Sequence, residues 1–198
     1  MSALTIACFW KFFFLGFLPI SGDIATYTYP PWYHHYHAKT KSQNPLLSDP
    51  VFLHYPLRKL ACERLKEGKI TLWNPYIFCG SPLFSTNSVS FCPLNLLFIF
   101  FDPLTAYSLI LILQMLLSGV FMYTFLRGSL SLGSFGALIG GIIYEFSGFS
   151  IVWLEMGILS GFLLPLILFL IDRAISRRSI FYTALAGIAL GIQLLSAF

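Results

Sequence analysis

The sequence predicts an all-α integral membrane protein, a polytopic helical bundle whose long first extracytoplasmic loop carries an amphipathic helix. Composition is the first reason, because 57% of the 198 residues are hydrophobic and only 10% are charged, against about 25% in an average soluble domain. Secondly, the apolar residues form runs of about 20, the length that a helix needs to cross a bilayer. Thirdly, the chain has 21 Phe and 10 Tyr, which fits lipid-facing surface and aromatic belts at the membrane interfaces.

Five segments are apolar enough to be candidate spans. The first carries Lys11 in its middle, the third is interrupted only by Glu145, and the fourth contains Pro165. The five segments comprise residues 4–20, 104–126, 130–154, 156–171 and 180–198. We expect residues 1–198 to form a single transmembrane domain, the N-terminal portion of a longer polytopic chain.

The basic residues set the expected orientation. Arg127 follows the second segment, and the cluster from Arg173 to Arg178 follows the fourth. Short turns that carry arginine tend to stay in the cytoplasm, so the N-terminus is expected inside and residues 21–103 form the extracytoplasmic loop. The net charge of +4 does not indicate nucleic-acid binding, since the basic residues are few and divided between this loop and two turns.

Within the loop, the segment LRKLACERLKEGK (residues 57–69) has the pattern of an amphipathic helix. Its apolar positions fall on one helical face, its charged residues lie elsewhere, and Gly68 is a C-cap signal. Two placements stay open: a helix on the outer membrane surface, or an ordinary solvated helix.

Turn signals follow this helix. Asn74-Pro75, Gly80 and Ser81-Pro82 exclude long regular elements. Cys79 and Cys92 bracket this part and could form a disulfide, with inert thiols as the alternative. Residues 93–101 are apolar but too short to span, so an interfacial or re-entrant piece is expected.

Several stretches of the loop resemble a known family. They are GKITLWNPY (residues 68–76), GSP (80–82) and FCPLN (91–95), preceded by Asp49 and Tyr55-Pro56. They are similar to the first external loop of YfhO-type bacterial membrane proteins, which belong to the GT-C class of multi-span glycosyltransferases. The resemblance implies a multi-pass protein of the bacterial cell membrane. It also implies sugar transfer from a polyprenyl-phosphate carrier to an extracytoplasmic glycopolymer or lipid acceptor.

The same resemblance implies a catalytic acid in the first external loop, where a carboxylate would take the proton of the acceptor hydroxyl. Asp49 matches the family acid and is the first choice. Asp23 is the second choice, because it lies close to the membrane but within residues 21–43, which look like an insertion. An Asx-turn or a helix N-cap is the structural alternative for both.

Six further side chains are expected at the substrate. Cationic groups are needed near the departing phosphate, and aromatic rings at a tight turn could stack on a sugar or anchor at the interface. A solvated helix face is the alternative for the two basic residues. The expected substrate-binding residues are Arg58, Lys59, Trp73, Asn74, Tyr76 and Glu155. We expect no cofactor and no metal, because YHHYH (residues 33–37) fits an interfacial aromatic segment better than a histidine site.

Glu145 is the one acidic residue inside an expected span, and it would be costly in lipid unless it faces the bundle interior. It is therefore a functional candidate, with Lys11 as a possible partner across the bundle. A second function stays open: a non-enzymatic polytopic protein, such as a transporter or an envelope-assembly partner, with a structural loop. A polar path from Glu145 through the bundle would favour transport.

Overall fold

The computed structural model describes residues 1–28, 34, 48–69, 72–77, 79–82, 93–155 and 160–196. These residues are mostly helical, as predicted. Their β-structure is one short antiparallel pair, β1 (Trp73–Asn74) with β2 (Ser81–Pro82), in which Trp73 pairs with Pro82.

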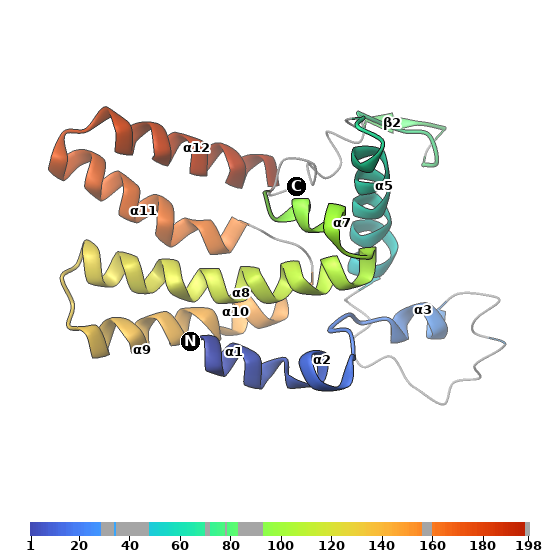
Figure 1. Cartoon of the computed structure of the whole chain (residues 1–198), viewed down its shortest axis with the longest axis horizontal. Coiled ribbons are helices and arrows are strands. Elements are labelled where there is room, and N and C mark those ends of the chain that lie inside the picture. Colours follow the sequence, from blue (N-terminus) through green and yellow to red (C-terminus); the bar gives the residue numbers. More distant parts are fainter. Residues whose placement is uncertain are drawn as a thin grey trace.

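The body of the molecule is a layer of helices that lie side by side (Figure 1). The central helix α8 packs against α9 on one side and against α11 on the other, and α12 packs against α11. Asp102 caps α8 by accepting a hydrogen bond from the Thr105 backbone N–H at 3.0 Å. Hydrogen bonding from Thr105 also lowers the pKa of Asp102. These four helices are α8 (Pro103–Gly128), α9 (Ser134–Glu145), α11 (Ser160–Arg177) and α12 (Ile180–Ser196).

The expected second span, 104–126, agrees with α8 to within two residues at each end. The expected third span, 130–154, is not one continuous helix. Its helix α9 ends at Glu145, and a separate helix, α10 (Gly148–Val152), starts after Ser147. The Ser147 hydroxyl caps α10 by accepting from the Ser150 backbone N–H at 3.2 Å. Of the expected fourth and fifth segments, residues 156–159 and 197–198 lie outside the described residues.

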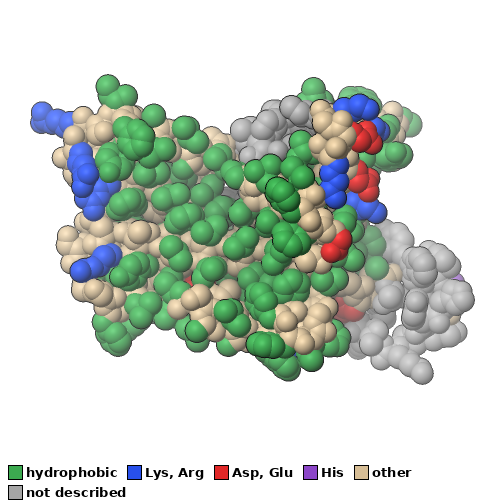
Figure 2. Space-filling model, viewed as in Figure 1, with side chains coloured by type: hydrophobic (Ala, Val, Ile, Leu, Met, Phe, Trp, Pro, Cys, Tyr) green, Lys and Arg blue, Asp and Glu red, His purple; other side chains and the backbone are tan. Residues whose placement is uncertain are grey.

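Two helical segments are long and apolar enough to cross a membrane, judged by length and composition. They are Pro103–Gly128 and Ser134–Val152, the second counting α9 and α10 together. Only 17% of the most apolar window of Ser134–Val152 is buried inside the protein, whereas the core helix of a soluble protein would be mostly buried. Figure 2 shows the consequence, a largely apolar surface over the bundle with charged side chains gathered toward its two ends.

The N-terminal segment also differs from the single helix expected over residues 4–20. It forms α1 (Ser2–Cys8) and α2 (Trp10–Leu15), which are separated at Phe9, and Gly16 ends α2 in a left-handed conformation with φ 70°. α1 packs against α8 and starts beside the middle of the bundle (Figure 1). Each helix is too short to cross a bilayer by itself.

A helix is present where the amphipathic segment was expected: α5 (Tyr55–Lys66), which follows a π-helical segment η1 (Pro50–His54). α5 lies across one end of the bundle (Figure 1). Residues 93–100 form a 3₁₀ turn, η3 (Pro93–Leu96), and a short helix, α7 (Leu97–Phe100), which contacts both α5 and α8. Gly68 follows α5 with φ 73°, a conformation that glycine adopts at little cost. A short helix α3 (Asp23–Thr28) belongs to the preceding loop.

The opposite end of the bundle carries the arginine turns. An Nη atom of Arg173 donates to the backbone oxygen of Gly128 at 2.7 Å, which joins the C-terminal end of α11 to that of α8. Arg127 and the cluster from Arg173 to Arg178 therefore lie at the same end of the bundle, as the expected topology requires.

Candidate functional site

Arg58 lies on the buried face of α5, not on the solvated face that was the structural alternative for it. Its side chain is 1% exposed. The guanidinium lies over the ring of Tyr107 in the first turns of α8, with 5.1 Å between Arg58 Cζ and the ring centre. This geometry is a cation–π contact, which is strongest where water is excluded.

Tyr107 connects this contact to a distant part of the chain. Its hydroxyl donates to the backbone oxygen of Glu155 at 2.7 Å. The Glu155 carboxylate in turn accepts from the backbone N–H and from the hydroxyl of Ser21, both at 2.8 Å. The structure thus brings together two expected substrate-binding residues, Arg58 and Glu155. We call Ser21, Arg58, Tyr107 and Glu155 the Arg58 cluster.

The guanidinium of Arg58 has unused hydrogen-bonding capacity. Its Nε and one Nη are buried and have no hydrogen-bond partner among the described residues. The ion pairs within the described part of the chain join Lys59 to Glu63, and Glu67 to both Arg64 and Lys69, without Arg58. Because arginine stays protonated and a buried, unpaired charge costs several kcal/mol, this position is suited to an anion.

A second group of expected residues lines a hollow between α5 and the Trp-Asn-Pro-Tyr turn. The hollow has a volume of about 470 Å³, and Lys59, Asn74 and Tyr76 line it together with Phe52 and Glu63. Asn74 is 2% exposed, and its side-chain oxygen accepts from the Tyr76 backbone N–H at 2.9 Å, which makes an Asx-turn. Lys59 forms an exposed ion pair with Glu63 at 3.8 Å.

Trp73 takes a different position from its neighbours. It is exposed, and its indole ring lies against Gly80 in the short hairpin. A Cβ atom at Gly80 would be only 2.6 Å from Cζ2 of Trp73, and Gly80 also has φ 112°. Glycine is therefore required here on both steric and backbone grounds.

The two candidate acids lie apart from the Arg58 cluster. Asp49 precedes η1, is exposed, and accepts from the Ser48 hydroxyl at 3.4 Å. Phe52, three residues later, lines the hollow beside α5, so Asp49 lies close to that hollow along the chain. Asp23 is in the first turn of α3.

Glu145 is fully buried, as expected for an acid in an apolar bundle, but its partner differs from the expected Lys11. The Thr5 hydroxyl of α1 donates to Glu145 Oε1, while Lys11 lies near the ring of Trp10. Glycine makes room for the carboxyl, because a Cβ at Gly119 would be 2.7 Å from Glu145 Oε2. The sequence did not predict Thr5 as the partner of Glu145, because no sequence pattern relates a threonine inside a helix to an acid 140 residues away.

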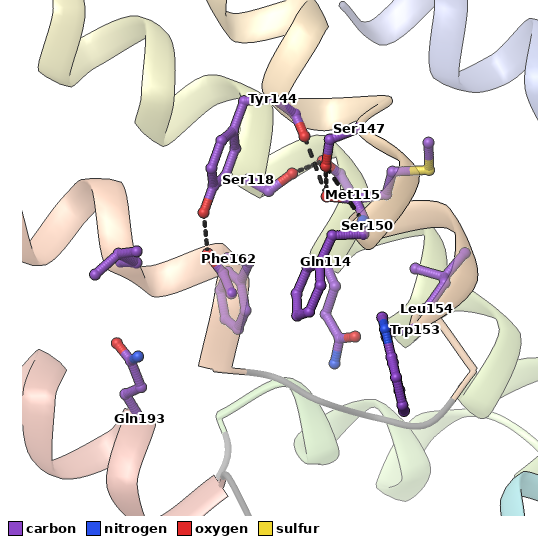
Figure 3. A pocket seen from close by; sticks show the side chains of 13 residues that line it. Gln114, Met115, Ser118, Tyr144, Ser147, Ser150, Trp153, Leu154, Phe162 and Gln193 are labelled. Atoms are coloured by element: carbon purple, nitrogen blue, oxygen red, sulfur yellow. Dashed lines mark hydrogen bonds between the residues drawn. The ribbon is translucent and has the colours of Figure 1, made fainter.

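A cavity of about 540 Å³ lies inside the bundle, between α8, α10, α11 and α12 (Figure 3). Gln114 on α8 and Gln193 on α12 line it, together with Ser118, Tyr144 and Trp153. Sequence reasoning missed both glutamines. A signal was available in the sequence: a strongly polar amide inside an otherwise apolar span is costly in lipid, and it marks a functional candidate as a charged residue does.

Two further expectations concern residues that the structure describes only in part. Cys79 has a free, exposed thiol and φ 59°, and Cys92 lies outside the described residues. Of the YHHYH segment, only His34 is described.

No family model, curated protein or solved structure matches the chain. The resemblance to YfhO-type proteins therefore stays a prediction, and the site is argued from its own geometry.

Proposed function

We propose that the chain is the N-terminal part of a multi-pass bacterial membrane glycosyltransferase, which transfers a sugar from a polyprenyl-phosphate carrier to an extracytoplasmic glycopolymer or lipid. The observation that carries this proposal is the buried guanidinium of Arg58, which has free donors at one end of an apolar bundle. The resemblance of the loop to YfhO-type proteins supports it independently.

The position of Arg58 suits a lipid-linked phosphate. The apolar surface of the bundle fits a hydrocarbon environment, and α5 lies across its end, where lipid headgroups would lie (Figure 2). A phosphate there has its isoprenoid chain in the bilayer and its oxygens at the level of α5. A guanidinium offers paired N–H donors that match two phosphate oxygens, and it stabilises the negative charge that develops as the sugar leaves.

The neighbouring hollow provides the expected sugar-binding groups. Tyr76 supplies an exposed ring that can stack on a sugar, and Lys59 and Asn74 supply polar groups beside it. Asp49, at the start of η1, is the proposed general base for the acceptor hydroxyl. Glu155 holds Ser21 and, through its backbone oxygen, Tyr107, so its proposed role is to position Arg58.

The test uses the full-length protein in membranes and follows the turnover of a polyprenyl-phosphate-linked sugar. Arg58→Gln should lower this turnover about 10²- to 10³-fold, the usual cost of losing a transition-state donor, and Arg58→Lys should retain part of it. Arg64→Gln is the matched control, because Arg64 lies on the same helix in an exposed ion pair with Glu67. Equal turnover in Arg58→Gln and Arg64→Gln, at equal membrane levels, would reject the proposal.

Transport is the second candidate, and the buried Glu145 favours it. An acid inside a membrane bundle commonly serves a proton or ion path. Glu145→Gln separates the two functions: a proton-coupled transporter would lose activity, whereas the proposed glycosyltransferase would keep its sugar turnover.

A further inference from the structure

The end of the bundle opposite α5 carries positive charge that the proposed sugar transfer does not use. It is formed by the turn between α8 and α9 and by the turn between α11 and α12. Figure 2 shows Lys and Arg side chains gathered at this end. Residues 127–134 and 172–180 together contain four arginines and one acid, Asp172. We call Arg127, Arg173, Arg177 and Arg178 the basic end.

Three of these guanidiniums are held in place by other parts of the chain. Arg127 and Arg173 donate to backbone oxygens within residues 128–132, at 2.9 and 2.7 Å respectively. The guanidinium of Arg177 lies over the ring of Tyr182, with 5.6 Å between Cζ and the ring centre. Each of the three makes one hydrogen bond with a described residue. Because a guanidinium has five N–H donors, further donors remain for an anion.

The packing of α8 against α11 positions Arg173 most closely. Its guanidinium lies over the ring of Phe169, with 5.1 Å between Cζ and the ring centre. A Cβ atom at Gly128 would be only 2.6 Å from this ring and 3.1 Å from Arg173 Nη2, so glycine makes room for both groups. The ion pairs within the described part of the chain all lie between residues 59 and 69. The charges of the basic end are therefore positioned but not neutralised.

Apolar side chains beside these charges are strongly exposed. Phe135 is 76% exposed, Ile175 73% and Ile180 87%. This combination distinguishes between two kinds of anionic partner. A soluble polyanion would pair with the arginines but leave the apolar side chains in water, which is unfavourable. A phospholipid carries its phosphate and its acyl chains in one molecule, so it covers the charged and the apolar groups together.

We propose that the basic end binds anionic phospholipid headgroups in preference to zwitterionic ones. The remaining guanidinium donors pair with phosphate oxygens, and the exposed apolar side chains contact the acyl chains. A zwitterionic headgroup carries its own cation, which repels the arginines, whereas the net negative charge of an anionic lipid attracts them. This inference does not depend on sugar transfer, because Arg58 belongs to α5 at the opposite end (Figure 1).

The experiment places a tryptophan reporter at the basic end. Phe181 is 66% exposed in the first turn of α12, so Phe181→Trp adds the reporter without changing the core. Phenylalanine replaces the four natural tryptophans, Trp10, Trp32, Trp73 and Trp153. The chain is reconstituted in phosphatidylcholine vesicles that contain equal fractions of either brominated phosphatidylglycerol or brominated phosphatidylcholine. Bromine quenches a tryptophan only at short range. The ratio of the two quenching efficiencies therefore measures the local preference, which we expect to be about three- to tenfold.

Arginine variants test the cause of this preference. Arg127→Gln, Arg173→Gln and Arg177→Gln together should bring the ratio close to one. A second variant, Arg177→Gln with Arg178→Gln, changes only exposed side chains and should lower the ratio about twofold or more.

The matched control removes the same amount of charge as the triple arginine variant, but at the α5 end of the bundle. It combines Arg64→Gln, Lys66→Gln and Lys69→Gln, and it should leave the ratio unchanged. A ratio near one in the parent reporter protein would overturn the proposal, and so would equal decreases in the arginine variants and in this control.

Inorganic phosphate distinguishes a headgroup site from a site for free anions. Compared with sodium chloride at the same ionic strength, which screens the charges equally, phosphate should not lower the ratio further. A decrease specific to phosphate would show that the basic end binds free anions rather than lipid, and it would also overturn the proposal.

Discussion

Arg58 of α5 and Tyr107 of α8 are in direct contact and help to join α5 to the apolar helical bundle. The guanidinium lies over the ring at 5.1 Å, and the Tyr107 hydroxyl continues the connection to the Glu155 backbone at 2.7 Å. Tyr55 packs edge-on against the same ring, with 6.0 Å between the ring centres. Burial raises the pKa of Tyr55, and the nearby carboxylates of Asp102 and Glu63 raise it further. Tyr55 therefore stays neutral and packs against the ring of Tyr107.

Tyr107→Phe tests the polar half of this connection. It keeps the ring below Arg58 but leaves the Glu155 oxygen without its donor, so the free energy of unfolding should fall by about 1–3 kcal/mol. Denaturant unfolding in detergent micelles measures this change. Tyr182→Phe is the control, since among the described residues the Tyr182 hydroxyl only accepts an exposed bond from Arg177 at 3.3 Å. Equal stability of the two variants would mean that the bond to Glu155 is not formed in the micelle.

The arrangement of charged ends predicts the membrane topology. Because the arginine turns share one end of the bundle and α5 lies at the other, single cysteines at Lys69 and Arg177 should be on opposite sides of the membrane. In a cysteine-free background and intact cells, an impermeant maleimide should label Lys69→Cys but not Arg177→Cys. Labelling of both positions, or of Arg177→Cys alone, would contradict the topology.

The difference between what the sequence predicted and what it missed follows from how each feature is encoded. α8 was predicted to within two residues at each end because a long, uncharged apolar run specifies a helix locally. The break at Phe9 and the burial of Arg58 depend on contacts with other helices, which no local pattern contains. Hydrophobic periodicity put the apolar residues of α5 on one helical face, where Leu57 and Ala61 are indeed buried, but it put Arg58 off that face, whereas Arg58 is buried with them.

Gly80→Ala should disrupt the hairpin that holds the Trp-Asn-Pro-Tyr turn. Alanine would bring a Cβ to 2.6 Å from the Trp73 ring and would have to adopt φ 112°. A cost of about 1–3 kcal/mol is expected for this strain. Gly68→Ala separates the two effects, because Gly68 also has positive φ but no atom within 4 Å of the added methyl. Faster proteolysis between residues 69 and 82 in Gly80→Ala than in Gly68→Ala would confirm the steric requirement, and identical rates would refute it.

Cys62 and Cys79 should differ strongly in reactivity. Burial raises the pKa of Cys62 to about 12, so at pH 9 its thiolate fraction is on the order of 0.1%. Iodoacetamide should therefore alkylate the exposed Cys79 while Cys62 stays protected until the protein unfolds. In the unfolded chain the Cys62 thiol ionises first, near its ordinary pKa of 9.0. The contribution of neutral, buried Cys62 to the free energy of unfolding is therefore lost between about pH 9 and 12. Cys62→Ala should weaken this pH dependence; early alkylation of native Cys62 would contradict its burial.

Asp49→Asn tests the proposed general base most directly. The substitution keeps the size of the side chain and much of its hydrogen bonding but removes the charge, and the loss of a general base commonly costs about 10²- to 10⁴-fold in rate. In the complete protein, sugar turnover should fall by that factor at normal membrane levels, whereas Asp23→Asn should have little effect. The reason for the difference is position: Asp49 immediately precedes η1, whose Phe52 lines the hollow beside Lys59 and Tyr76, while Asp23 belongs to α3. A collapse of activity in Asp23→Asn alone would reverse the assignment of the two acids, and full activity in both variants would remove the enzymatic role of this loop.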